Sequence, residues 1–155
     1  MKFHTAMKSS LRLLLALAFA SCMQMAAAET AATVTRSANV RSAPHASFPT
    51  VTWLLTGTRV TVIGCTPNWG WCDIVSGRNR GWMYSRYLSV PFEGSAVTIR
   101  NGGPNLGLPV AEFALGPYWD EHFQRQHWFS QKASWQARWD GTRAPPEWRA
   151  PSSSR

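Results

Sequence analysis

The chain has 155 residues and carries 16 lysines and arginines against 8 acidic residues, a formal net charge of +8 at pH 7. Beyond residue 28 no apolar run is long enough to cross a bilayer, which excludes a protein with several membrane spans. The basic excess is scattered rather than gathered into one run, so it also describes an ordinary solvated surface. A basic chain of this kind favours an anionic partner, and the two usual ones are nucleic acid and the cell envelope.

The first 28 residues have the order of a secretory signal peptide. Three basic residues precede a short apolar run at 13–20, and small residues follow up to Ala28. We expect cleavage after Ala28, which leaves 127 residues with 13 basic against 8 acidic side chains, a net charge of +5. Two alternatives are an uncleaved N-terminal anchor and a lipoprotein processed at Cys22. Export predicts a periplasmic or secreted protein, and it favours the envelope over nucleic acid as partner.

The cysteines agree with export. Without Cys22 the mature chain keeps Cys65 and Cys72, and an even count in an oxidising compartment predicts one disulfide between them. Their spacing does not fit the C-x-x-C motif of redox pairs, and no histidine stands at a zinc-ligand spacing from them. We therefore expect a structural disulfide, no metal and no cofactor.

From Thr33 to Val90 the pattern predicts an all-β fold. Short alternating segments are separated by Gly, Pro and Asn turns, with almost no helical period. Residues 29–32 are expected to be a short tail. The strands are predicted at 33–35, 38–41, 50–55, 59–63, 71–75, 80–84 and 88–90, with a one-turn helix at 85–87. Such strands, with no room for crossover helices, favour a small antiparallel barrel, to which the disulfide would contribute about 2.5 kcal/mol.

Four segments in this region, in order and spacing, closely resemble the bacterial SH3-like (SH3b) domain. They are ANVRSAP, LLTGTRVTVIG, WGWCDIV and GRNRGWMYSRYLS, and the resemblance covers residues 33–90. Ala43 departs from the family, which usually has Gly after the Arg-Ser pair. The resemblance implies an extracytoplasmic SH3-like barrel of a kind that commonly attaches to cell-wall peptide or serves as an accessory module. The whole chain is also similar to small secreted SH3b proteins of Gram-negative bacteria.

Residues 91–140 form a C-terminal extension rich in aromatic side chains. One strand is predicted at 96–100, and a helix is expected to begin near Pro117, with acidic residues in its first turn. The helix could continue as far as Trp139. The extension is too short for an independent domain, so its aromatic residues are expected to pack on the barrel. Residues 141–155 are predicted to be a disordered tail because prolines, serines and charges dominate them.

The candidate binding residues are aromatic and basic. Alternation along the strands places Ile74, with Val60, Val62, Met83 and Leu88, in the core, and leaves other aromatic residues on the outer face. SH3-type barrels hold extended peptides in an aromatic groove, and arginines pair with carboxylates. The predicted ligand-binding residues are Phe48, Trp71, Trp82, Tyr84, Tyr87, Arg41 and Arg80. In the alternative, two of the tryptophans fill the barrel ends or lie under the extension, and the arginines are solvated.

No catalytic constellation is evident. Both mature cysteines are committed to each other, and no G-x-S-x-G motif occurs. Asp120, Glu121, His122 and His127 form the single acid–histidine cluster, which we interpret as helix-start charges beside exposed histidines.

The sequence therefore predicts an exported, non-enzymatic binding module that engages peptidoglycan or another envelope polymer. The alternative is a periplasmic interaction or assembly factor that uses its Trp-rich C-terminal segment to bind an envelope protein. A third hypothesis, a wall hydrolase, rests on the frequent pairing of SH3b modules with such enzymes.

Overall fold

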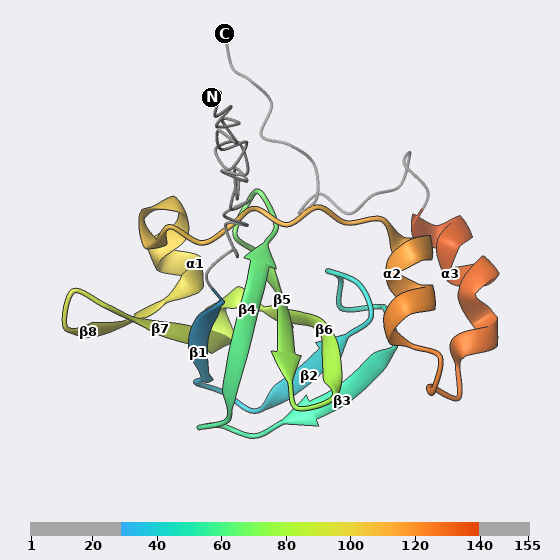
Figure 1. Cartoon of the computed structure of the whole chain (residues 1–155), viewed down its shortest axis with the longest axis horizontal. Coiled ribbons are helices and arrows are strands. Elements are labelled where there is room, and N and C mark those ends of the chain that lie inside the picture. The colour runs from blue at the N-terminus through green and yellow to red at the C-terminus, as the bar shows by residue number, and fades with distance from the viewer. Residues whose placement is uncertain (1–28, 140–155) are drawn as a thin grey trace, which may run out of the picture.

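The computed structural model describes residues 29–139 (Figure 1). The predicted signal peptide with Cys22, and the predicted disordered tail, lie outside the described residues. The described part is mostly antiparallel β sheet with a few short helices. Its strands are β1 (Thr30–Val34), β2 (Ala38–Arg41), β3 (Thr50–Leu54), β4 (Arg59–Cys65), β5 (Trp71–Ser76), β6 (Asn79–Tyr84), β7 (Leu88–Phe92) and β8 (Ser95–Thr98).

The eight strands form one sheet in the order β3-β2-β6-β5-β4-β1-β7-β8, and all the strand pairs are antiparallel. The predicted strands and the one-turn helix η1 (Ser85–Tyr87) are present. Strand β3 lies at one end of this order and β8 at the other, so closure of the predicted barrel is not confirmed. The sheet is consistent with an SH3-like fold.

The first strand begins earlier than the sequence suggested. Thr30 pairs with Val62 and Ala32 pairs with Val60, so residues predicted to be a tail are part of β1. The small side chain of Ala32 is buried in the core, which explains why this segment pairs although it lacks large apolar residues.

The hairpin of β4 and β5 carries the disulfide. Cys65 and Cys72 face each other across the two strands and are bonded, which confirms the predicted pairing. The turn between them is organised by Thr66, whose buried hydroxyl accepts hydrogen bonds from the backbone N–H groups of Gly70 and Trp71, both at 3.1 Å. The predicted core residues Val60, Val62, Ile74, Met83 and Leu88 are all buried, as the alternation of the strands required.

The C-terminal extension completes this core. Strand β8 ends at Thr98, and the short helix α1 (Ile99–Gly102) and the 3-10 helix η2 (Gly103–Leu106) follow it. The prediction of a strand through residue 100 is wrong at its end, because the chain turns inward there and Ile99 becomes fully buried in the main core with Leu108.

Two further helices lie at the opposite end of the molecule from the β7–β8 hairpin (Figure 1). They are α2 (Leu115–His122) and α3 (Lys132–Trp139), with the 3-10 helix η3 (Phe129–Gln131) before α3. A single helix through Trp139 is not formed, because α2 ends at His122 and Trp128 lies in the turns that follow.

A second hydrophobic cluster joins these helices to the sheet. Loop residues Ala43 and Phe48 meet the helical part of the extension there. The buried members contributed by the extension are Leu115, Trp119, Phe123, Trp128 and Trp139. The expected packing of the extension on the β fold is thus confirmed.

Candidate ligand-binding groove

The pairing of β5 with β6 builds an aromatic outer face. Trp71 lies opposite Tyr84, and Asp73 lies opposite Trp82. Because side chains alternate along a strand, these four share one face, while the residues between them point into the core. The outer face of the sheet therefore carries two neighbouring cross-strand pairs. One joins two aromatic residues, Trp71 and Tyr84, and the other joins Trp82 to the carboxylate of Asp73.

The C-terminal extension covers one half of this face. The ring centre of Trp82 lies 5.1 Å from that of Phe113 and 6.2 Å from that of Tyr118, and the Trp82 side chain has an exposed fraction of 0%. Phe48 is buried between Trp135 and Trp139 of α3, at 5.0 and 5.7 Å. Partial exposure, expected of all five aromatic candidates, is therefore wrong for Trp82 and Phe48, and also for Trp71, which has an exposed fraction of only 8%. The alternative, a tryptophan under the extension, describes Trp82.

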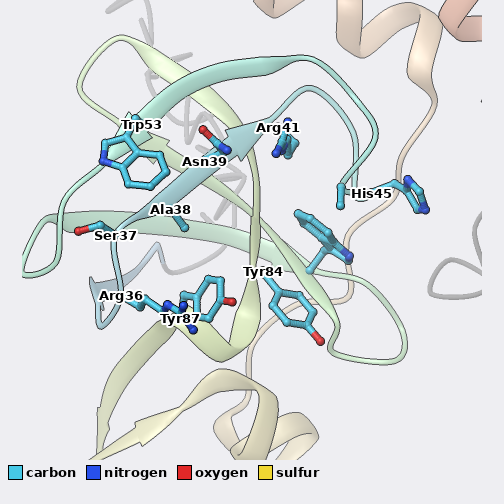
Figure 2. A pocket seen from close by; sticks show the side chains of 11 residues that line it. Arg36, Ser37, Ala38, Asn39, Arg41, His45, Trp53, Tyr84 and Tyr87 are labelled. Atoms are coloured by element: carbon cyan, nitrogen blue, oxygen red, sulfur yellow. The ribbon is translucent and has the colours of Figure 1, made fainter.

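The other half of the face stays open and forms a groove of about 460 Å³ (Figure 2). Four aromatic side chains line it, from β3, β5, β6 and η1. Trp71, Tyr84 and Tyr87 follow one another with ring centres 5.5 Å apart, and Trp53 lies across from them with 55% of its surface exposed. We name this site the aromatic groove; its lining is Arg36, Ser37, Ala38, Asn39, Arg41, His45, Ala46, Trp53, Trp71, Tyr84 and Tyr87.

The charge of the groove is positive. Arg36 lies over the Tyr87 ring at 5.4 Å from its centre, and Arg41 lines the opposite wall. Arg86, just outside, lies 5.2 Å from the ring centre of Tyr84. None of the residues that line the groove is acidic. Two guanidinium groups beside aromatic faces suit a ligand that combines flat or ring-shaped parts with carboxylates.

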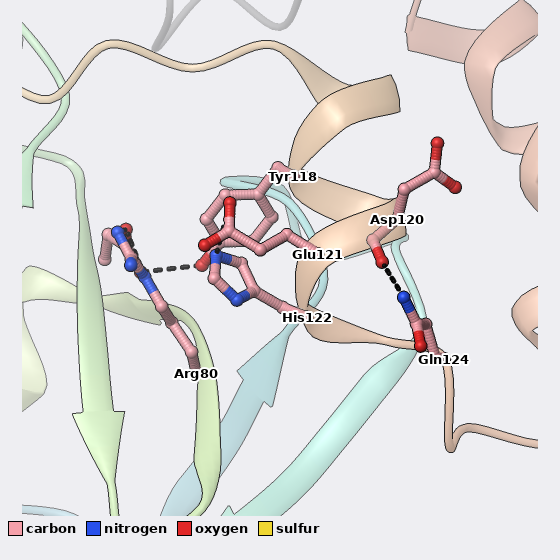
Figure 3. Close-up of polar contacts among 7 residues, drawn as sticks. Arg80, Tyr118, Asp120, Glu121, His122 and Gln124 are labelled. Atoms are coloured by element: carbon pink, nitrogen blue, oxygen red, sulfur yellow. Dashed lines mark hydrogen bonds and ion pairs between the residues drawn. The ribbon is translucent and has the colours of Figure 1, made fainter.

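Arg80 does not join the groove. Its Nε and Nη2 bind the carboxylate of Asp73 at 2.7–3.3 Å, and Tyr118 of α2 donates its hydroxyl to Asp73 Oδ1 at 2.6 Å. These three residues join the sheet to the extension (Figure 3). The hydrogen bonds with Asp73 raise the pKa of Arg80, so the guanidinium remains charged. Arg80 therefore stabilises the seam with α2 and borders a different pocket.

Four of the seven predicted ligand-binding residues come together in the groove: Arg41, Trp71, Tyr84 and Tyr87. Sequence reasoning missed Trp53, Arg36 and His45. Trp53 alternates with the buried Leu54 in a strand that was predicted, so the alternation already placed it on the outside. Arg36 precedes β2, and nothing in the local pattern indicates that it meets Tyr87.

The acid–histidine cluster separates into ordinary pairs. The interpretation of Asp120 and Glu121 as helix-start charges is wrong, because α2 already begins at Leu115 and has no acidic residue in its first turn. Asp120 binds Lys132 at 2.7 Å, and Glu121 lies 3.8 Å from His122. Within residues 29–139 no three His, Cys, Asp or Glu side chains gather in a way that could hold a metal ion. No helix in that range is long and apolar enough to cross a membrane.

A small antiparallel sheet with an open aromatic groove has the architecture of a binding module. Residues 36–89 match the family model of the bacterial SH3 domain, so the match includes β2 to η1 and every lining residue of the groove, and it ends before the extension. Domains of this family are binding modules often tied to cell-wall binding. No match was found among curated proteins or among solved structures. The family and the disulfide both fit an extracytoplasmic location.

Proposed function

We propose that this protein is an exported, non-enzymatic binding module that holds peptidoglycan, or another polymer of the cell envelope, in the aromatic groove. The observation that carries the proposal is the composition of the groove: four aromatic side chains, two arginines and a histidine, without an acidic residue in the lining. The family match supports it, because these domains are often tied to cell-wall binding. The signal-like N-terminus and the disulfide support export.

The chemistry of the wall fits this lining. Peptidoglycan alternates sugar rings, which stack on aromatic faces, with peptides that carry carboxylates. Trp53 and Tyr87 offer rings on two sides of the groove, and Arg36 and Arg41 offer charged donors. An aromatic contact contributes about 1 kcal/mol beyond its buried area, and a charge-assisted hydrogen bond about 1.5–3 kcal/mol. Two or three such contacts give a micromolar to millimolar affinity, which repeated sites on a polymer would raise.

Co-sedimentation with purified sacculi tests the proposal. The wild-type protein should pellet in a saturable way, and Trp53→Ala should weaken its binding about tenfold. Leu55→Ala is the matched control, because Leu55 is exposed just after β3 and does not line the groove. If the protein stays in the supernatant at every salt concentration, the proposal fails. Release of soluble muropeptides in the same tubes would indicate a wall hydrolase instead.

The second candidate, an assembly factor that docks through its Trp-rich end, has less support. It rests on the five tryptophans after residue 118, which are too many for so short a segment to bury by itself. Of the four that the structure describes, Trp119, Trp128 and Trp139 are buried in the second cluster, and Trp135 packs on Phe48. These residues are used within the protein, so the aromatic groove remains the better-supported binding surface.

A further inference from the structure

A second pocket lies where the extension meets the sheet. It has a volume of about 370 Å³ and is enclosed by the turn of the β5–β6 hairpin, the end of α2 and the turn after α2. We name it the seam pocket; its lining is Arg78, Asn79, Arg80, Glu121, His122, Gln124, Arg125 and Gln126. All eight side chains are polar, and none of them lines the aromatic groove. The pocket therefore suits a polar ligand and is separate from the proposed envelope-binding site.

Arg80 is held ready to bind an anion. Nε and Nη2 of its guanidinium donate to the buried carboxylate of Asp73 in a two-point ion pair. The hydroxyl of Tyr118, on α2, donates a further hydrogen bond to Asp73. A guanidinium has five N–H donors, so the two-point pair with Asp73 does not use all of them. Because Asp73 already fixes its position, the guanidinium of Arg80 loses little side-chain entropy when it binds a further oxyanion.

The charges around the pocket favour an anion. Arg78 and Arg125 add two exposed guanidinium groups from opposite sides, whereas Glu121 is the single acidic residue of the lining. The Glu121 side chain is 72% exposed and lies at the rim, 3.8 Å from His122 Nε2. Even with Asp73 counted behind Arg80, three positive charges stand against two negative ones. Figure 3 shows Arg80, Glu121 and His122 gathered at this place.

We propose that the seam pocket binds an oxyanion, the phosphate or carboxylate group of a polar molecule, between Arg78, Arg80 and Arg125. His122 provides an internal reporter of this binding. Burial, and then repulsion by Arg80, lower its pKa below the ordinary value, while Glu121 and Asp73 oppose the shift. Its ring also packs on Tyr118 at 4.5 Å. A bound anion would offset the repulsion by Arg80, so the pKa of His122 should rise.

The test is an NMR titration of the ¹⁵N-labelled protein with inorganic phosphate and, separately, with acetate at constant ionic strength. Saturable shifts should appear at residues 78–80 and 121–126, together with a higher pKa of His122. The arm with the lower dissociation constant tells whether phosphate or carboxylate is the preferred group. Because the aromatic groove shares no residue with this pocket, its signals report separately on the proposed function.

Variants of exposed residues complete the design. Arg78→Gln and Arg125→Gln should each weaken binding about fivefold or more, as expected for the loss of a charged donor. Glu121→Gln should tighten it, because a repulsive charge is removed. Arg59→Gln, an exposed arginine of β4 outside both pockets, should change nothing. The proposal is overturned if neither anion gives saturable shifts up to about 100 mM, or if the Arg78→Gln/Arg125→Gln double variant binds like the wild type.

Discussion

Arg41 is anchored by Phe48: its Nη1 donates a hydrogen bond to the Phe48 carbonyl at 3.1 Å, and also to Thr50 Oγ1 at 3.0 Å. The ring of Phe48, in turn, is packed between Trp135 and Trp139 of α3. An arginine that lines the aromatic groove thus depends for its position on a loop that the C-terminal extension holds. This arrangement gives the extension a part in the groove although it contributes no lining residue.

Truncation of Trp135 should loosen this support. Trp135→Ala removes an aromatic contact on Phe48 and should lower the free energy of unfolding by about 1–2 kcal/mol. Affinity for sacculi should fall several-fold, since Arg41 loses a fixed acceptor. Trp135→Phe, which keeps a ring on Phe48, should restore both quantities. Urea denaturation and co-sedimentation measure them, and unchanged affinity in a destabilised Trp135→Ala protein would show that the extension does not position Arg41.

Trp82 should behave as a core residue. Its side chain is fully buried beneath Phe113 and Tyr118, so Trp82→Ala should cost about 3–5 kcal/mol of stability. Tyr84→Ala, at the neighbouring position of the same face, should cost less stability and reduce sacculus binding. Denaturant midpoints of the two variants measure the loss of stability, and co-sedimentation with sacculi measures the loss of binding. A stable Trp82→Ala protein with weakened binding would contradict the covered position of Trp82.

The disulfide should stabilise the β4–β5 hairpin by constraining the unfolded chain. Cys65 and Cys72 close a short loop, so the Cys65→Ser/Cys72→Ser double variant should lose about 2.5 kcal/mol in the chain-entropy model. Both sulfurs are buried, and the polar hydroxyls that replace them can add to the loss. Comparison with the Cys65→Ala/Cys72→Ala variant separates the two effects. If the double alanine variant is as stable as the wild type, the disulfide does not stabilise the folded protein.

The seam between Asp73 and Tyr118 should weaken in alkali. Burial, and then the nearby carboxylate of Asp73, raise the pKa of Tyr118 well above its ordinary value of 10.0. The folded state therefore holds the phenolic proton more tightly than the unfolded chain does, and stability is lost as pH rises above about 10. Tyr118→Phe should remove this part of the pH dependence. Unfolding free energies between pH 8 and pH 11 measure it, and an identical decline in Tyr118→Phe would assign the loss to other groups.

The β fold could be predicted because its signals are local. Alternation placed Ile74 and Met83 in the core, turn residues separated the strands, and cysteine count and export identified the disulfide. The same alternation placed Trp82 on the outer face, and that is where it lies. What alternation cannot show is whether an outer face is covered by a segment more than thirty residues further along the chain.

The site was predicted incompletely for the same reason. Trp71, Tyr84 and Tyr87 are brought together by adjacent elements, and they line the groove as expected. Phe48 and Arg80 were predicted to bind ligand because one is aromatic and the other basic. In the structure Phe48 packs on Trp135 of α3, and Arg80 pairs with Asp73, which binds Tyr118 of α2. Ile99 shows the effect on the backbone, since a strand-like residue enters a short helix to fill the core.

Binding of the cell envelope by the aromatic groove is tested most directly by an NMR titration of the protein with soluble peptidoglycan fragments that contain both sugar and peptide. We expect saturable shifts in residues 36–41, in the indole N–H signals of Trp53 and Trp71, and around Tyr84 and Tyr87. Residues 115–139 should shift little, and the Trp53→Ala protein should bind about tenfold more weakly. Absence of saturable shifts in the groove, or shifts centred on α2 and α3, would contradict the assignment of the aromatic groove as the envelope-binding site.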